Sequence, residues 1–263
     1  MKLFLENFGY ACLFLFCLAV TFFGIQTEPY KMAMSQNATS AKIAIVIDDF
    51  GYGASGTEQM FSLSIPLSVA ILPFSEFAEK EGVLAVEHGK EVLVHMPMEA
   101  LTGDPSWVGS EGIFRTMTTE KIIEQTKKAF EILPMAVGLN NHMGSAIMED
   151  ERSLSAVFSY MQEKGDVFFL DSVTTAKSQG ERLAKVYDVP FIKRDVFLDG
   201  TKDVETIKNN LQKAGEVALE HGFAVAIGHV GIEGGEATAT ALAEMIPILQ
   251  NQGIEFVFLS GLV

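Results

Sequence analysis

Short apolar runs rich in Val, Ile and Phe recur along the chain, and segments with helical spacing of apolar residues separate them. The runs predict strands at residues 42–48, 67–72, 91–95, 135–140, 167–171, 189–193, 223–228 and 254–259. The intervening pattern predicts helices at residues 55–64, 76–88, 118–132, 150–164, 177–186, 202–220 and 236–252. Continuous apolar runs are typical of strands buried on both faces, as in parallel sheets. The alternation therefore predicts an α/β fold: a distorted (β/α) barrel of seven to eight parallel strands, with a doubly wound open sheet as the alternative.

The N-terminal region does not share this alternation. Lys2 precedes an apolar run that extends to Ile25, and this pattern predicts a signal peptide or a membrane anchor over residues 1–25. The polar and small residues 26–41 predict a linker, so the folded domain is expected over residues 42–263. Both N-terminal alternatives bring this segment to the membrane or the secretion machinery. Either one predicts an extracytoplasmic domain.

Composition narrows the possible partners and chemistry. The formal net charge is -15, and no basic run along the sequence could contact phosphates, which argues against nucleic acid as a partner. Both cysteines, Cys12 and Cys17, lie in the N-terminal apolar run, so the domain has neither a disulfide nor a thiolate ligand. Any metal ion in the domain must therefore be held by His, Asp or Glu. The chain also lacks the G-x-S-x-G motif of serine hydrolases.

Polar residues with catalytic potential follow several of the predicted strands. The pair Asp48-Asp49 ends the first run, and His95, His142 and His229 end or follow three others. The carboxyl ends of parallel strands share one face of a barrel, so these side chains are expected to converge there. Two carboxylates and three imidazoles on one rim predict a metal-dependent hydrolase.

Other polar motifs carry less functional weight. His88 and His221 stand directly before Gly89 and Gly222 at expected helix ends, and this arrangement is typical of a structural helix C-terminus. The glycine-rich segment 51–56 is loosely similar to a dinucleotide-binding loop. The carboxylates before it would repel a pyrophosphate, so we exclude that interpretation.

Six motifs occur in order along the domain. They are I-D-D-F-G-Y (47–52), H-M-P-M-E (95–99), N-N-H-M-G-S (140–145), L-D-S (170–172), R-D-V-F-L-D (194–199) and I-G-H-V (227–230). Together they resemble the divergent polysaccharide deacetylase family over the whole domain. This resemblance implies a deacetylase-like distorted barrel with a divalent metal, usually zinc. It also implies an acetylated glycan as substrate, either peptidoglycan or another envelope polysaccharide.

The resemblance also implies roles for individual residues. Asp48 takes the place of the catalytic base, and His229 takes that of the general acid. Asp49, His95 and His142 are the expected metal ligands, with His142 supplying the imidazole that ordinary members carry elsewhere.

This chain departs from the ordinary family pattern at two motifs. Glu99 stands where the second motif usually has a histidine, and Asn140 with its neighbours occupies the place of an arginine that orients the base. Arg194 is expected to supply the missing charge, and Asp171 is expected to orient His229. The candidate substrate-binding residues are Trp107, Asn141 and Ser172.

Two other functions remain open from the sequence. The altered motifs also fit a catalytically degenerate barrel that acts as a glycan-binding or scaffold module. A glycosidase with Asp48 and Asp49 as paired carboxylates is disfavoured, because adjacent residues on a regular strand point to opposite sides.

Overall fold

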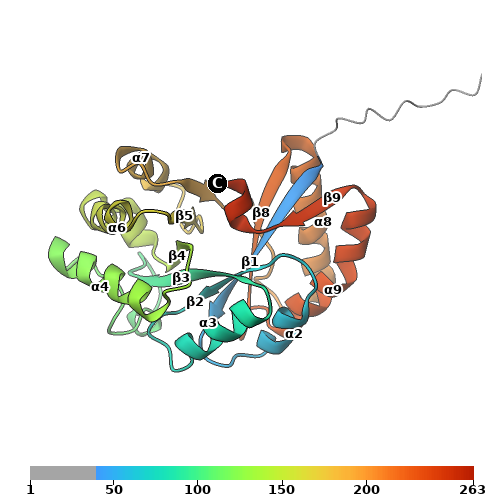
Figure 1. Cartoon of the computed structure of the whole chain (residues 1–263), viewed down its shortest axis with the longest axis horizontal. Helices are drawn as coiled ribbons and strands as arrows, with labels where there is room; N and C mark the ends of the chain where they lie inside the picture. Colours follow the sequence, from blue (N-terminus) through green and yellow to red (C-terminus); the bar gives the residue numbers. More distant parts are fainter. Residues whose placement is uncertain (1–39) are drawn as a thin grey trace, which may run out of the picture. The chain divides into compact units, whose positions relative to one another are not determined.

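The computed structural model describes residues 40–263 (Figure 1). The predicted signal peptide or anchor over residues 1–25, and all but the last two residues of the predicted linker, lie outside these described residues. Within residues 40–263, no helix combines the length and apolar character needed to cross a membrane.

A sheet of parallel strands forms the centre of the domain, and the helices lie around its outside (Figure 1). The strands are β1 (Ala41–Phe50), β2 (Ser68–Ile71), β3 (Glu91–Met98), β4 (Gly138–Met143), β5 (Phe168–Asp171), β6 (Phe191–Lys193), β7 (Val196–Phe197), β8 (Phe223–His229) and β9 (Ile254–Val257). Eight of them follow the order β6-β5-β4-β3-β2-β1-β8-β7, and β9 pairs with the start of β1. The sheet curls as a half-barrel, which confirms the predicted fold class.

Helices connect most of the strands. They are α2 (Thr57–Ser62), α3 (Ala78–Glu87), α4 (Thr119–Ile132), α5 (Ser145–Glu149), α6 (Glu151–Lys164), α7 (Gly180–Val186), α8 (Val204–His221) and α9 (Glu236–Asn251), with 3₁₀ turns η1 (Pro105–Trp107) and η2 (Leu259–Leu262). Three of the long helices begin at side-chain caps: Thr118, Asp150 and Asp203 each accept a hydrogen bond from the backbone N–H three residues later. Such caps satisfy N–H groups that have no partner inside the helix.

The differences from the predicted elements lie at strand ends and in short segments. The pattern did not predict β7 or α5, because two and five residues are too short to show a period. β4 begins and ends three residues later than expected. The last predicted strand stops at Val257, and η2 follows it after Phe258.

The interior of the half-barrel has its own hydrophobic cluster. Every second residue of a strand points into it, for example Ala44 and Val46 in β1, or Val225 and Ile227 in β8. Leu259 of η2 joins the same cluster from the end where the strands begin, and its N–H donates to Ser68 Oγ (3.2 Å) at the start of β2. Leu259 therefore covers the interior at the end where the strands begin, opposite their carboxyl ends.

Candidate metal centre and active site

The alternation that fills the interior with apolar residues ends in a polar layer. Two residues beyond Val46 and Ile227, the inward positions are Asp48 and His229, which are register partners on adjacent strands. In β3, the next inward residue after Leu93 is His95. The polar layer thus lies directly above the apolar interior, where the strands end.

The backbone at Asp49 brings both carboxylates of the pair to one site. Asp49 has φ 69, a left-handed conformation that side-chain-bearing residues rarely adopt, and the β1–β2 register is irregular between Ile47 and Phe50. His95 Nε2 consequently lies 3.8 Å from Asp48 Oδ2 and 3.3 Å from Asp49 Oδ1. The expectation that the two residues point to opposite sides is wrong, because it assumed a regular strand.

Asp49, His95 and His142 offer three ligand atoms to one point. The distance from His142 Nδ1 to Asp49 Oδ1 is 3.1 Å, and the two imidazoles approach to 3.1 Å between His95 Nε2 and His142 Nδ1. Bonds of about 2.0–2.1 Å to a tetrahedral ion place its ligand atoms about 3.3–3.4 Å apart, close to these separations. Asp49 Oδ1 is also buried without a hydrogen-bond partner among the described residues. The donor set therefore fits a divalent cation with a position left open.

Asn140 joins the metal site to Asp48. Its Nδ2 donates to Asp48 Oδ1 (2.9 Å), so its Oδ1 is free to accept from Nδ1–H of His95 (2.8 Å). This hydrogen bond puts the proton of a neutral His95 on Nδ1 and leaves a lone pair on Nε2, the atom that faces Asp49. The buried amide thus sets both the tautomer of a proposed ligand and the position of the proposed base.

The charges in this layer perturb one another. Burial would raise the pKa of Asp49, but His142 and His95 outweigh it and hold that pKa well below its usual range. Burial alone would lower the pKa of His95, and the carboxylates of Asp48 and Asp49 raise it overall. Asp48 is more deeply buried, and burial raises its pKa despite the nearby imidazoles of His95 and His229. A cation bound at this site would offset the negative charge of the Asp49 carboxylate, which protonated imidazoles offset in its absence.

His229 faces the polar layer from β8 and is held by Asp199. Asp199 Oδ1 lies 2.7 Å from His229 Nδ1, and Oδ2 accepts both the His229 backbone N–H (2.8 Å) and the Thr238 hydroxyl (2.5 Å). Burial opposes protonation, but the hydrogen bond to Asp199 and the charge of Asp48 raise the pKa of His229 to about 9. Gly234 permits this arrangement, because a Cβ there would lie 2.0 Å from Asp199 Oδ2.

Asp199, rather than Asp171, orients His229. Leu170 belongs to the interior cluster, so the next residue, Asp171, points to the other side of the strand. Its oxygens accept from the Val173 N–H (2.7 Å) and from Ser178 Oγ (2.6 Å). The expected contact between Asp171 and His229 is therefore wrong, and the role we infer for Asp171 is to shape the loop after β5.

Arg194 does not occupy the place next to Asp48 that we expected. Its Nε and Nη2 donate to the carbonyl oxygens of Ser172 (2.9 Å) and Val173 (3.2 Å), and the guanidinium lies 5.0 Å from the centre of the Phe197 ring. Burial lowers the pKa of Arg194, although Asp171 and Asp48 are close enough to oppose this through their charge. The group that hydrogen-bonds the proposed base is the neutral amide of Asn140.

Glu99, at the altered position of the second motif, turns away from the metal site. Its carboxylate accepts from the Arg115 guanidinium (2.8 Å) and from the Arg115 backbone N–H (2.7 Å), and this tie closes the loop between β3 and α4. Trp107 lies on the same loop and is exposed to solvent. Glu99 therefore shapes the rim of the site, and His142 completes the set of candidate ligands.

The predicted substrate-binding residues Asn141 and Ser172 lie beside the polar layer. Asn141 Oδ1 accepts from the Ser172 backbone N–H (3.0 Å), and Asn141 Nδ2 donates to the Met143 carbonyl (2.7 Å). Ser172 Oγ lies 3.3 Å from Asn140 Nδ2. Their contact with a substrate stays a prediction.

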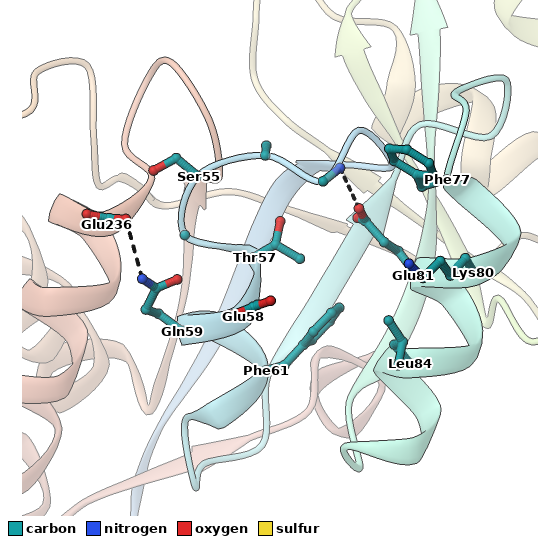
Figure 2. Close-up of a pocket in the computed structure, with 13 residues that line it drawn as sticks. Ser55, Thr57, Glu58, Gln59, Phe61, Phe77, Lys80, Glu81, Leu84 and Glu236 are labelled. Atoms are coloured by element: carbon teal, nitrogen blue, oxygen red, sulfur yellow. Dashed lines mark hydrogen bonds between the residues drawn. The ribbon is translucent and has the colours of Figure 1, made fainter.

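Glu81 was not among the predicted site residues, yet it holds the loop that follows Asp48 and Asp49. Its carboxylate accepts from the N–H groups of Gly51 (2.6 Å) and Gly53 (2.6 Å), the second of which Figure 2 shows as a dashed line. The only sequence signal for this role was an acidic residue in the predicted helix, and the helical pattern does not reveal that its side chain is buried.

The hollow of about 370 Å³ in Figure 2 lies between α2 and α3, and no candidate metal ligand lines it.

Comparisons with known proteins identify the family of the chain. The sequence profile of one family, Divergent polysaccharide deacetylase, matches residues 45–263. The uncharacterized protein YibQ of Escherichia coli K12 is 34% identical over 215 residues, which cover 82% of this chain and 65% of that protein. An uncharacterized protein of Haemophilus influenzae Rd is 34% identical over 189 residues, covering 72% of this chain and 66% of that protein. The chain thus spans about two thirds of the length of these relatives.

Solved structures share the fold at low sequence identity. An uncharacterized protein from Agrobacterium tumefaciens C58 superposes with a TM-score of 0.78 at 20% identity, over 86% of this chain and 91% of that one. The Bc1960 peptidoglycan N-acetylglucosamine deacetylase has a TM-score of 0.55 at 16% identity, over 84% and 87% of the two chains. The peptidoglycan deacetylase PdaC from Bacillus subtilis has a TM-score of 0.52 at 14% identity, over 85% and 90%.

Proposed function

The chain belongs to the divergent polysaccharide deacetylase family, and from that premise we propose that it is a metal-dependent hydrolase that removes acetyl groups from a cell-envelope glycan. N-acetyl groups are the proposed primary target, with O-acetyl groups as the alternative. The observation that carries the proposal is the juxtaposition of the Asp49, His95 and His142 cluster with the buried Asp48. An apolar N-terminal run that predicts export or anchoring is in keeping with an envelope substrate.

The proposed cofactor is a divalent metal, with zinc first. One carboxylate oxygen and two imidazole nitrogens with an open position are typical of catalytic zinc sites, although imidazole also suits iron, nickel and copper. When bound, such an ion would lower the pKa of a water molecule and polarise the acetyl carbonyl.

Asp48 and His229 divide the proton transfers between them. Asp48 lies beside the ligand cluster and would accept the proton of the attacking water, and burial raises its pKa, which makes its carboxylate a stronger base than an exposed one. His229 has a pKa of about 9 and therefore carries a proton at neutral pH. It would give this proton to the leaving amine as the carbon–nitrogen bond breaks, so that acetate and a free amine result.

Acetate release is the direct test of this proposal. Asp48→Asn and His229→Ala should each retain the metal but lose activity by about 10²–10⁴-fold, the usual contribution of general acid–base catalysis. His221→Ala is the matched control, since this exposed histidine ends α8 away from the candidate site. Acetylated oligosaccharides with added zinc, cobalt or nickel form the assay.

Turnover by the wild type and by His221→Ala, with both site variants impaired, supports the assignment. Unchanged turnover in both site variants overturns the two roles. If the wild type releases no acetate from any substrate but binds glycans, the domain acts as a binding module on a deacetylase barrel.

A further inference from the structure

Trp107 is an exposed aromatic side chain on a loop that is held in place. It is 66% exposed, while its neighbour Val108 is buried. Asp104 caps the turn that carries it, accepting from the backbone N–H groups of Ser106 (2.8 Å) and Trp107 (3.1 Å). Further along the loop, the Ile113 N–H donates to the Pro97 carbonyl (2.8 Å) and fastens the loop to β3. The ring is therefore presented to solvent from a fixed backbone.

Tyr52 is presented in the same way from the loop after β1. It is 58% exposed, but the residues on both sides of it, Gly51 and Gly53, donate their N–H groups to the buried carboxylate of Glu81. Figure 2 shows the bond from Gly53. The Gly51 carbonyl also accepts from the Phe77 N–H (2.8 Å). A Cβ on Gly51 would lie 1.9 Å from a side-chain oxygen, so this close approach requires glycine.

Tyr52 and Trp107 line one hollow of about 210 Å³. Its other lining residues include Phe74, Ser75, Pro97 and Glu111. The hollow adjoins the candidate metal centre, because Pro97 is the register partner of His142 and Tyr52 follows Asp49 by three residues. Its volume is below the roughly 300–1,000 Å³ of sites that enclose a drug-sized ligand, so it suits a single ring.

The two aromatic rings favour a sugar as the occupant. A pyranose ring has an apolar C–H face that can cover an aromatic face, and a hydroxyl rim that can reach the hydroxyl of Ser75, the carboxylate of Glu111 and water. A phosphorylated ligand is disfavoured because no Lys or Arg among the described residues lines the hollow and the net charge of the chain is -15. Fixed loops reduce the entropy lost when a flexible glycan binds.

We propose that Tyr52 and Trp107 form a platform on which one sugar ring of the glycan stacks, next to the sugar whose acetyl group lies at the metal centre. This inference rests on the proposed function and extends it. It makes the substrate an oligomer rather than a monosaccharide. Binding should strengthen when the glycan becomes long enough to occupy both places.

The chain provides its own reporter for this platform, because Trp107 is its one tryptophan. Its intrinsic fluorescence can be followed while β-linked N-acetylglucosamine oligomers, from the monosaccharide to the pentasaccharide, are added to the full chain. We expect the emission to change with the longer oligomers and to saturate. Cellulose oligomers of equal length test whether the acetamido group contributes.

Variants identify the residues responsible. Trp107→Ala, followed by calorimetry, and Tyr52→Ala, followed by fluorescence, should each weaken binding of the longer oligomers about tenfold, with little effect on the monosaccharide. Both should raise KM for long substrates more than they lower kcat. Phe223→Ala is the matched control, since this exposed aromatic residue begins β8 at the opposite end of the barrel.

The outcomes separate this proposal from the proposed function. Acetate release without any fluorescence response, or with unchanged KM in both variants, overturns the platform and leaves the hydrolase. A saturable response that both variants weaken supports the platform even if no acetate is released, and in that case only the hydrolase fails. Equal losses in Phe223→Ala also overturn the platform, because they indicate a general effect on the fold.

Discussion

The carboxylate of Asp199 accepts hydrogen bonds from both the ring Nδ1–H (2.7 Å) and the backbone N–H (2.8 Å) of His229. The contact fixes the ring orientation and stabilises the imidazolium, so that the other ring nitrogen is directed away from Asp199. A second acid, Glu233, lies 3.9 Å from the same nitrogen but is half exposed. Asp199 is therefore the positioning residue for the proposed general acid.

Asp199→Asn should shift the pH dependence of activity. The pKa of His229 is raised to about 9, and an amide in place of the carboxylate should let it fall toward its ordinary value of 6.5. Acid catalysis needs the protonated ring, so the basic limb of the kcat profile should move to lower pH. At pH 8 the variant should lose much more activity than at pH 6. Asp171→Asn is the control, and an identical basic limb in all three proteins contradicts the assignment.

The same contact predicts a pH-dependent contribution to stability. The folded pKa of His229 is about 9 and the ordinary value is 6.5, so the folded protein binds this proton more tightly than the unfolded chain. The stabilisation is fully present below pH 6.5 and is lost as pH rises through 9, by at most about 3 kcal/mol. Urea unfolding with a chelator present should show this loss in the wild type and a smaller one in Asp199→Asn. Parallel pH curves for the two proteins count against it.

Metal binding should depend on the three clustered ligands and not on Glu99. His95→Ala and His142→Ala should each abolish stoichiometric metal, because two ligands remain in the cluster. In the wild type, zinc at about 100 times its Kd should stabilise the fold by about 2.7 kcal/mol, and EDTA should reverse this. Glu99→Gln is the control, since that carboxylate is paired with Arg115. Elemental analysis and thermal unfolding report the result, and full metal content in either histidine variant shows the site to be misassigned.

Much of the barrel and the ligand cluster could be predicted because both follow from short-range patterns. The apolar runs located most strands, and the polar residues at their carboxyl ends met where parallel topology brings such ends together. The inward and outward alternation also contained the information that Asp171 lies on the opposite face from Leu170. Counting positions along each strand, instead of locating its end, would have excluded Asp171 as the partner of His229.

Other features depend on contacts between distant segments and leave no local signal. Asp199 reaches His229 across 30 positions of sequence, and Asn140 reaches Asp48 across 92. The left-handed backbone at Asp49 breaks the alternation that strand patterns assume. Such strained conformations persist where surrounding structure holds them, and they cluster at functional sites.

Leu259→Ala should destabilise the domain without affecting metal binding. The side chain is fully buried in the interior cluster, which it enters at the end opposite the candidate metal centre. Removing a buried leucine costs about 2–5 kcal/mol, because both transfer free energy and packing are lost. Leu219→Ala on the exposed face of α8 should change the unfolding free energy by less than about 0.5 kcal/mol. Urea unfolding measures both, and equal effects would show that η2 does not pack as described.

Asn140→Ala should weaken the metal site even though Asn140 is not a ligand. The side chain is fully buried and makes one hydrogen bond to His95 Nδ1 (2.8 Å) and another to Asp48 Oδ1 (2.9 Å). Without the first, His95 loses the acceptor that selects its tautomer, and loss of such a partner typically costs 10–100-fold in metal affinity or activity. Metal affinity by competition with a chromophoric chelator is the measurement. Activity at saturating metal should remain low, since Asp48 also loses its donor.

A neighbouring residue separates positioning from simple destabilisation. Asn141 lies beside Asn140 in β4 and also bonds the surrounding chain, through the Ser172 N–H (3.0 Å) and the Met143 carbonyl (2.7 Å), but it does not contact His95 or Asp48 in the hydrogen-bond network of the described residues. Asn141→Ala should therefore lower the unfolding free energy by about 1–3 kcal/mol with a smaller change in metal affinity.

Asn140→Asp should restore one of the two contacts, because a carboxylate can still accept a hydrogen bond from His95 Nδ1 but would repel the carboxylate of Asp48. It should recover metal affinity more than activity. Equal metal affinities in the wild type and Asn140→Ala would show that Asn140 does not support the metal site. If Asn140→Asp recovers activity but not metal affinity, the contact with His95 is not the one that supports metal binding.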